Sequence, residues 1–158
     1  MKYKDNFLDS FSLKYIKHLI DTEIQNDVCL DVPLFQSYGD MQIRHKDDLV
    51  FSNFLANVLD YVNNELSANL VIDKCWFNIC KSISKYTYHD HNPIPVSAVF
   101  YLEGCRNNGT IFRVGDAELQ TICDDNSLLV FDGGFLHKVP PWKGQDRYSI
   151  AFDFSEGA

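Results

Sequence analysis

Cys-x-x-Cys pairs, long apolar runs and basic clusters are all missing from this sequence of 158 residues, and each absence excludes a class of protein. The cysteine count is odd, and the spacing fits neither a redox pair nor a zinc finger. This argues against a disulfide framework and indicates free thiols in a reducing compartment. We expect the five to be small buried hydrophobic residues: Cys29, Cys75, Cys80, Cys105 and Cys123.

No stretch of the chain approaches the length of a membrane-spanning segment, and residues 1–9 carry neither an apolar signal segment nor a lipidation motif. Lysine and arginine together number 14 against 22 aspartates and glutamates, which gives a formal net charge of −8. Nucleic acids and anionic membranes are bound chiefly by clusters of Lys and Arg. We therefore expect neither as a partner, and we expect a cytoplasmic protein.

The sequence does contain enough apolar side chains for one folded unit. Hydrophobic residues make up 46% of the chain and aromatic residues 14%, which suffices at this length to bury a core without disulfides. There is no internal repeat, low-complexity tract or interdomain linker. The prediction is a single domain over residues 1–158.

Residues 1–69 have a helical pattern and form the expected support for the rest of the chain. Apolar residues recur there at three- and four-residue spacing in two segments, which predicts helices near Asp9–Ile20 and Asp48–Asn63. One of the aspartates at positions 47 and 48 is the expected N-cap of the second helix. Leu30–Arg44 contains a proline and a glycine, so we interpret it as a loop with room for one strand.

From residue 70 onward the pattern changes to short runs rich in β-branched and aromatic residues, separated by turn residues. The predicted strands are Leu70–Cys80, Lys85–His89, Val96–Leu102, Gly109–Val114, Glu118–Ile122, Ser127–Phe131 and Tyr148–Phe154. Such a series favours a mostly antiparallel barrel or jelly roll over βαβ units. Its core spans residues 70–154, and five of its side chains are expected to pack against the helices: Phe112, Val130, Phe131, Ile150 and Phe152.

Three of the five histidines fall at the ends of predicted strands. Residues i and i+2 of an extended segment project from the same face, so His89 and His91 can direct two imidazoles to one point. His137, from a distant strand, would complete a site that keeps positions open, as a catalytic metal requires. The alternative is that these are surface histidines with hydrogen bonds at turns. His18 and His45 lie in the helical part and are interpreted as ordinary.

The segment His89–Pro93 resembles the iron-binding motif of the 2-oxoglutarate-dependent Fe(II) oxygenases. The likeness is to compact prolyl-hydroxylase-like members and to short members from bacteria and their phages. Further segments resemble the strand after that motif, the Gly-Gly-x-Thr-x-Phe turn and the distal half of the family: Ser97–Leu102, Asn108–Phe112, Leu128–Phe131, His137–Pro140 and Arg147–Phe152. The resemblance covers about residues 70–154.

The resemblance implies a double-stranded β-helix, which is a cupin-like jelly roll, flanked here by helices. It also implies an oxidoreductase, a dioxygenase that uses Fe(II), 2-oxoglutarate as cosubstrate and dioxygen. The implied iron ligands are His89, His91 and His137. Most members have His-x-Asp or His-x-Glu at the first pair, and three neutral imidazoles would leave the double charge of the metal uncancelled. Asp90 replaces His91 as ligand if the backbone twists.

By the same resemblance Arg147, ten residues after the distal histidine, binds the far carboxylate of 2-oxoglutarate. The planar fork of a guanidinium suits a carboxylate. Ser149 shares a strand face with Arg147 and can add a hydroxyl, and Tyr101 matches a family tyrosine that reaches the same carboxylate. The alternative for Arg147 is a surface ion pair with Asp146 or Asp153.

The likeness to prolyl hydroxylases favours hydroxylation of a peptide or protein side chain such as proline. The loop at residues 30–44 would shape the groove, and Asn78 either contacts the substrate or bonds local backbone. Two other functions fit the sequence. One is a three-histidine cupin dioxygenase that acts without 2-oxoglutarate, which His91 favours and Arg147 opposes. The other is a non-catalytic jelly roll that binds a ligand, in which the histidines are incidental.

Overall fold

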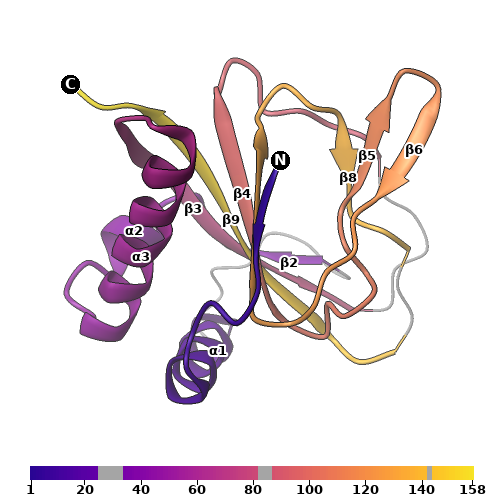
Figure 1. Cartoon of the computed structure of the whole chain (residues 1–158). Helices are drawn as coiled ribbons and strands as arrows, with labels where there is room; N and C mark the ends of the chain where they lie inside the picture. Colours follow the sequence, from indigo (N-terminus) through magenta and orange to yellow (C-terminus); the bar gives the residue numbers. More distant parts are fainter. Residues whose placement is uncertain (25–33, 82–86, 142–143) are drawn as a thin grey trace.

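The computed structural model describes residues 1–24, 34–81, 87–141 and 144–158, and these form two antiparallel β-sheets with helices on one side (Figure 1). The order of the large sheet is β1 (Lys2–Lys4), β7 (Ser127–Asp132), β4 (Val96–Glu103), β9 (Arg147–Glu156), β3 (Leu70–Cys80), β2 (Leu34–Gln36). The order of the small sheet is β6 (Ala117–Gln120), β5 (Ile111–Val114), β8 (His137–Lys138). The helices are α1 (Ser10–Ile24), α2 (Met41–Arg44) and α3 (Leu49–Leu66). The predicted mainly β fold with flanking helices is confirmed.

Alternation of side chains along the strands gives the large sheet one apolar face and one face that carries polar groups. On β9, Ile150 and Phe152 are buried in the same cluster as side chains of α1 and α3. The intervening positions of β9 carry Arg147, Ser149 and Asp153, which are also buried but project to the other side. The helices therefore cover one face of the sheet, and the polar face is left for the functional site.

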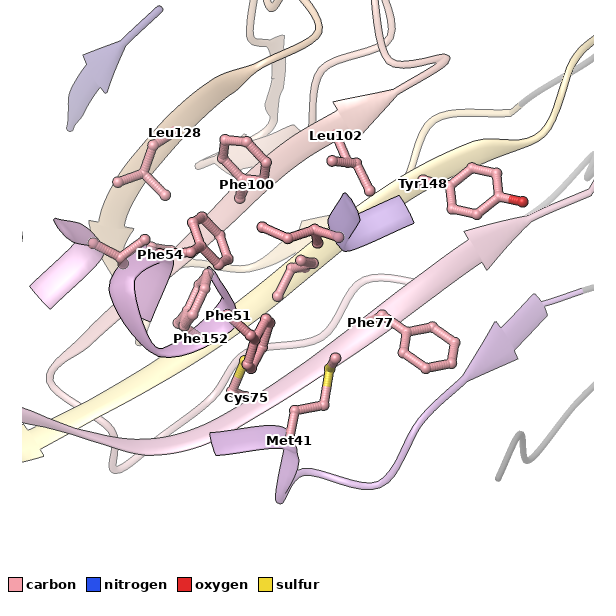
Figure 2. Packing of buried hydrophobic residues seen from close by; sticks show 14 of the residues in the cluster. Met41, Phe51, Phe54, Cys75, Phe77, Phe100, Leu102, Leu128, Tyr148 and Phe152 are labelled. Atoms are coloured by element: carbon pink, nitrogen blue, oxygen red, sulfur yellow. The ribbon is translucent and has the colours of Figure 1, made fainter. Parts of the chain in front are cut away.

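Phe54 of α3 lies at the centre of the helix-side core (Figure 2). Its ring centroid is 4.9 Å from that of Phe100 on β4 and 5.9 Å from that of Phe152 on β9. Burial of one such side chain stabilises the fold by about 1.5–3 kcal/mol. At the start of the same helix the carboxylate of Asp48 accepts a hydrogen bond of 2.9 Å from the Phe51 N–H. This cap satisfies one of the free N–H groups of the first turn.

The two long helices match their predictions. Both start one residue after the predicted position and extend three or four residues past the predicted end, and Asp48 is the N-cap of α3. The sequence did not predict α2, because a helix of four residues is too short to show a period. No helix in the described ranges combines the length and the apolar character that a membrane crossing requires.

Most of the predicted strands are confirmed, with ends that shift by up to two residues. The run at residues 85–89 lies partly outside the described residues, and of its described part only His89 forms a β-bridge. The loop predicted at Leu30–Arg44 had room for one strand, and the structure has one there, β2. The sequence did not predict β1 and β8, since strands of three and two residues carry no alternation.

The prediction that Phe112 and Phe131 pack against the helices is wrong. Both side chains are buried, but they belong to a second cluster between the two sheets, where their ring centroids are 5.0 Å apart. Val130 faces the helices, so its neighbour on β7 must face the small sheet. For Val130, Ile150 and Phe152 the prediction is confirmed, because all three lie in the helix-side cluster.

The cysteines of the described residues are buried, as predicted, while Cys29 lies outside the described residues. Cys75, Cys105 and Cys123 are free thiols. Burial raises the pKa of Cys105 to about 12 and that of Cys123 to about 11. Thiols with such pKa values are protonated and unreactive at neutral pH.

Candidate active site

Backbone hydrogen bonds bring the three strand-end histidines together. His89 pairs with His137 of β8 across an antiparallel bridge, in which each N–H donates to the carbonyl of the other at 3.0 and 2.8 Å. The His91 N–H donates to the Gly133 carbonyl at 2.7 Å. Position 133 must be glycine, since a Cβ there would lie 2.2 Å from the carbonyl oxygen of Ile94. The pairing of distant segments thus fixes the relative positions of the imidazoles.

The side chains of these histidines form a cluster that can hold a metal ion. One ligand atom from each of His89, His91 and His137 lies within 4.8 Å of the others. Their exposure falls from His89, which is exposed, to His137, which is buried. Asp90 is not in the cluster: its carboxylate is exposed and accepts a hydrogen bond of 3.1 Å from the Asn92 N–H. The structure therefore brings together the three predicted ligands and places the alternative ligand Asp90 elsewhere.

The Nδ1 atoms of two of these imidazoles have protein partners. His137 Nδ1 lies 2.7 Å from the carbonyl oxygen of Phe135, and His91 Nδ1 lies 2.6 Å from Oδ1 of Asp153. A carbonyl and a carboxylate are acceptors, so each Nδ1 is the donor of its hydrogen bond, and Nε2 is the nitrogen that a neutral ring would offer to a metal. Such partners fix the tautomer and the ring orientation of metal-binding histidines.

The protein environment favours the neutral form of two of the histidines, His89 and His137. Burial is the main cause that lowers the pKa of His137 to about 4, and the neighbouring imidazoles lower it further. Although His89 is exposed by surface area, the protein atoms around its ring desolvate it and lower its pKa, and His91 lowers the pKa further. Only an uncharged imidazole can offer a lone pair to a metal. The environment thus favours the protonation state that metal binding requires.

The histidines line one side of a cavity of about 370 Å³ between the two sheets. Residues of β3, β4 and β9 form other parts of its wall, including Asn78, Val99, Arg147, Ser149 and Ala151. Asn78 lies opposite Ser149 in the register of β3 with β9. This volume has the size of a pocket for a small molecule.

Arg147 is the largest fully buried side chain of the described residues, with 1% of its surface exposed. Its Nε and Nη2 donate to the same acceptor, the carbonyl oxygen of Asn108, at 3.2 and 3.1 Å. The guanidinium carbon lies 5.5 Å from the centre of the Tyr101 ring. Among the described residues no carboxylate forms an ion pair with it. A buried cation of this kind is costly unless an anion joins it.

Neither carboxylate of the alternative interpretation pairs with Arg147. Asp146 accepts a hydrogen bond of 2.8 Å from Lys81, and Asp153 lies against His91. Ser149 is buried on the same face of β9 as Arg147 and lines the same cavity. The interpretation of Arg147 as a surface residue is therefore wrong.

Tyr101 lies behind the cavity rather than in its wall. Its hydroxyl is 2.7 Å from Oγ1 of Thr110, and the Thr110 N–H donates to the same hydroxyl at 3.2 Å. Thr110 itself lines the cavity. The phenol ring thus supports two polar groups of the wall, Thr110 and Arg147, from behind.

No protein-family model matches this sequence, and no curated protein matches it. Solved structures are similar to almost its whole length. A prolyl-4-hydroxylase from Pseudomonas putida is 20% identical with a TM-score of 0.75, and the match covers 99% of this chain and 92% of that one. HygX from Streptomyces hygroscopicus, with nickel and 2-oxoglutarate bound, is 12% identical with a TM-score of 0.77 and coverage of 98% and 81%. An oxidoreductase of the 2OG-Fe(II) oxygenase family from Burkholderia pseudomallei is 14% identical with a TM-score of 0.72 and coverage of 97% and 82%.

The chain has the fold of the 2-oxoglutarate/Fe(II) oxygenases. The predicted double-stranded β-helix is thereby confirmed. In this oxygenase fold the large and small sheets are the two halves of the barrel, and the histidine cluster lies between them.

A second cavity of about 480 Å³ adjoins the histidine cluster on the outside of the oxygenase fold. Gln36, Trp76 and His91 line both cavities. The outer one is bounded by residues 36–39, which belong to the predicted loop, and by residues 92–94 after the His-x-His motif. Residues 30–33 of that loop lie outside the described residues.

Sequence reasoning missed two residues beside the histidines, Asp153 and Ser97. Ser97 Oγ donates to Oδ1 of Asp153 at 2.8 Å and lies 3.2 Å from His91 Nδ1. The same alternation that joins Ser149 to Arg147 also places Asp153 on the cavity face of β9. The sequence therefore contained a signal for the face of Asp153, whereas its contact with His91 depends on the pairing of distant strands.

Proposed function

We propose that this chain is an Fe(II)- and 2-oxoglutarate-dependent dioxygenase. One observation carries the proposal: a buried guanidinium without a carboxylate partner among the described residues lines the same cavity as three clustered imidazoles. A ligand that satisfies both ends needs a carboxylate at one end and metal-chelating oxygens at the other. 2-Oxoglutarate has both, and the fold is that of enzymes that use it.

The residues present fit both cofactor and cosubstrate. His89, His91 and His137 would hold Fe(II) through neutral nitrogens, which suit this metal and leave positions open for other ligands. Arg147 would bind the far carboxylate of 2-oxoglutarate with the edge of its fork that Asn108 does not occupy. Ser149 would add a hydroxyl from the same strand face.

Thr110 is a better placed second hydroxyl than Tyr101, because Thr110 lines the cavity. In this arrangement Tyr101 does not touch the carboxylate as predicted. It holds in place two groups that do, the Thr110 hydroxyl and the Arg147 guanidinium. Both arrangements use the same phenol. Tyr101→Phe should weaken 2-oxoglutarate binding more than Thr110→Val does if Tyr101 contacts the carboxylate, and less than Thr110→Val does if Thr110 contacts it.

With both groups bound, the overall reaction converts 2-oxoglutarate and dioxygen to succinate and carbon dioxide, and one oxygen atom enters the substrate. The protein contributes position and exclusion of water. Apolar side chains in the cavity wall, among them Val99, Val139 and Ala151, limit the space that water can fill. The buried end of the cavity makes the ion pair of Arg147 stronger than it would be at the surface.

We further propose a peptidyl substrate with an exposed side chain such as proline. The outer cavity leads to His91 and combines aromatic faces, Tyr38 and Trp76, with the amide groups of Gln36 and Asn92. Aromatic faces pack well against proline rings, and amides can bond an extended backbone. A prolyl-4-hydroxylase is among the similar structures.

A three-histidine dioxygenase that works without 2-oxoglutarate is the second candidate, because the ligand cluster contains no carboxylate. The two are separated by adding 2-oxoglutarate to the anaerobic Fe(II)-loaded protein. The proposed function predicts a metal-to-ligand charge-transfer absorption that saturates with 2-oxoglutarate, and then a mass gain of one oxygen on proline-containing peptides in air. If the absorption does not develop in iron-loaded protein, the second candidate is favoured.

A further inference from the structure

A buried carboxylate lies directly behind one of the three histidines. Asp153 of β9 is 5% exposed, and its Oδ1 is 2.6 Å from His91 Nδ1 and 2.8 Å from Ser97 Oγ. Ser97, on β4, is the direct cross-strand neighbour of Asp153 and has no exposed surface. The carboxylate is therefore held in place by a hydroxyl on one side and an imidazole on the other.

The cationic side chains nearby do not neutralise this carboxylate. Lys74 is its cross-strand neighbour on β3, but it is exposed, and among the described residues no lysine or arginine forms an ion pair with Asp153. Arg147 lies on the same face of β9 and donates instead to Asn108. A buried carboxylate without a cationic partner is costly. The hydrogen bond to His91 thus connects an uncompensated negative charge to the metal site.

We propose that Asp153 is a positioning residue that gives the three-histidine site the negative charge which a carboxylate ligand would supply in a His-x-Asp site. The inference rests on the proposed function. By accepting the Nδ1 proton of His91, Asp153 fixes the tautomer that offers Nε2 to the metal and raises the electron density of the ring. The charge acts through the imidazole, so a divalent metal bound by three neutral nitrogens is partly compensated.

The Asp153→Asn substitution tests this role with little change of shape, because an asparagine oxygen can still accept from His91 and Ser97. We expect the affinity for Fe(II), measured anaerobically by competition with a chromophoric chelator, to fall about 10- to 100-fold. The Asp90→Asn variant is the matched control: it removes the same charge from an exposed carboxylate next to His91. It should bind Fe(II) within about threefold of wild type.

A second readout separates charge from structure. In Asp153→Asn, an imidazole that donates less electron density should shift the charge-transfer absorption of the Fe(II) and 2-oxoglutarate complex to shorter wavelength. In a His91→Asp background the effect of Asp153→Asn should reverse. There position 91 itself carries a carboxylate, Asp153 repels it, and removal of the second charge should leave Fe(II) affinity equal or higher.

Equal Fe(II) affinity of wild type and Asp153→Asn would overturn the proposal, and so would an equal loss in both backgrounds, which would mean a structural role. If Asp153→Asn does not fold, proton NMR of the Zn(II)-loaded wild type decides. The His91 Nδ1 proton must then be strongly deshielded, and its absence would overturn the proposal. Failure of the proposed function looks different, since wild type itself would then bind no Fe(II) or give no absorption with 2-oxoglutarate.

Discussion

Replacement of Arg147 should weaken binding of 2-oxoglutarate without loss of the metal. The guanidinium is 1% exposed and donates through Nε and Nη2 to one carbonyl oxygen, so part of its fork remains for a ligand. Arg147 is not in the histidine cluster, and the Arg147→Ala variant should therefore keep its affinity for Fe(II). The variant leaves the far carboxylate of the cosubstrate in a buried site without its cation.

The loss of one partner from a desolvated ion pair costs about 2–5 kcal/mol. This corresponds to a roughly 30- to 4,000-fold rise in the dissociation constant of 2-oxoglutarate. Lysine should restore only part of the affinity, because a point charge cannot reproduce two parallel hydrogen bonds. The assay is a titration of 2-oxoglutarate into anaerobic Fe(II)-loaded protein, followed by the charge-transfer absorption.

Arg113→Ala is the control for this series. Arg113 lies on β5, is exposed and donates to the Gly115 carbonyl outside the cavity, so its removal should leave the affinity unchanged. Equal dissociation constants for wild type and Arg147→Ala would refute the reasoning. They would show that the buried cation serves the fold alone.

Three further predictions concern the metal and the fold. Alanine at any of the three clustered histidines should abolish Fe(II) binding measured by calorimetry, while Asp90→Ala should retain it. If His91→Ala binds Fe(II) and Asp90→Ala does not, Asp90 rather than His91 is the ligand. Phe54→Ala should lower the free energy of unfolding in urea by about 3–5 kcal/mol, and a loss below about 1 kcal/mol would contradict the core described above. Asp48→Ala removes the N-cap of α3 and should cost about 0.5–2 kcal/mol in the same assay, so an unchanged midpoint would refute the importance of the cap.

The elements with a clear period could be predicted from the sequence. The apolar spacing of α3 and the β-rich runs of β3, β4, β7 and β9 each repeat a pattern over several turns or residues. The shortest elements, α2, β1 and β8, have too few residues to repeat one. Their place depends on partners: β8 exists because His137 and Lys138 pair with β5.

The candidate site likewise has features that the sequence predicts and features that it does not. The spacing of the His-x-His motif and the positions of Arg147 and Ser149 on one strand face are local, and the sequence contains them. The contact of Asp153 with His91 and the place of Thr110 between Tyr101 and the cavity join segments that are distant in the chain or separated by a turn. Such contacts depend on register and on the direction of side chains, which a single sequence does not determine.

Release of succinate from 2-oxoglutarate tests the central claim most directly. Anaerobic Fe(II)-loaded protein is mixed with 2-oxoglutarate and exposed to air, and succinate is measured by chromatography for the wild type and for the His137→Ala variant. We expect succinate only when the wild-type protein, Fe(II), 2-oxoglutarate and dioxygen are all present, and more of it when a proline-containing peptide is added. Iron-loaded wild-type protein that leaves 2-oxoglutarate intact with and without peptides would contradict the account.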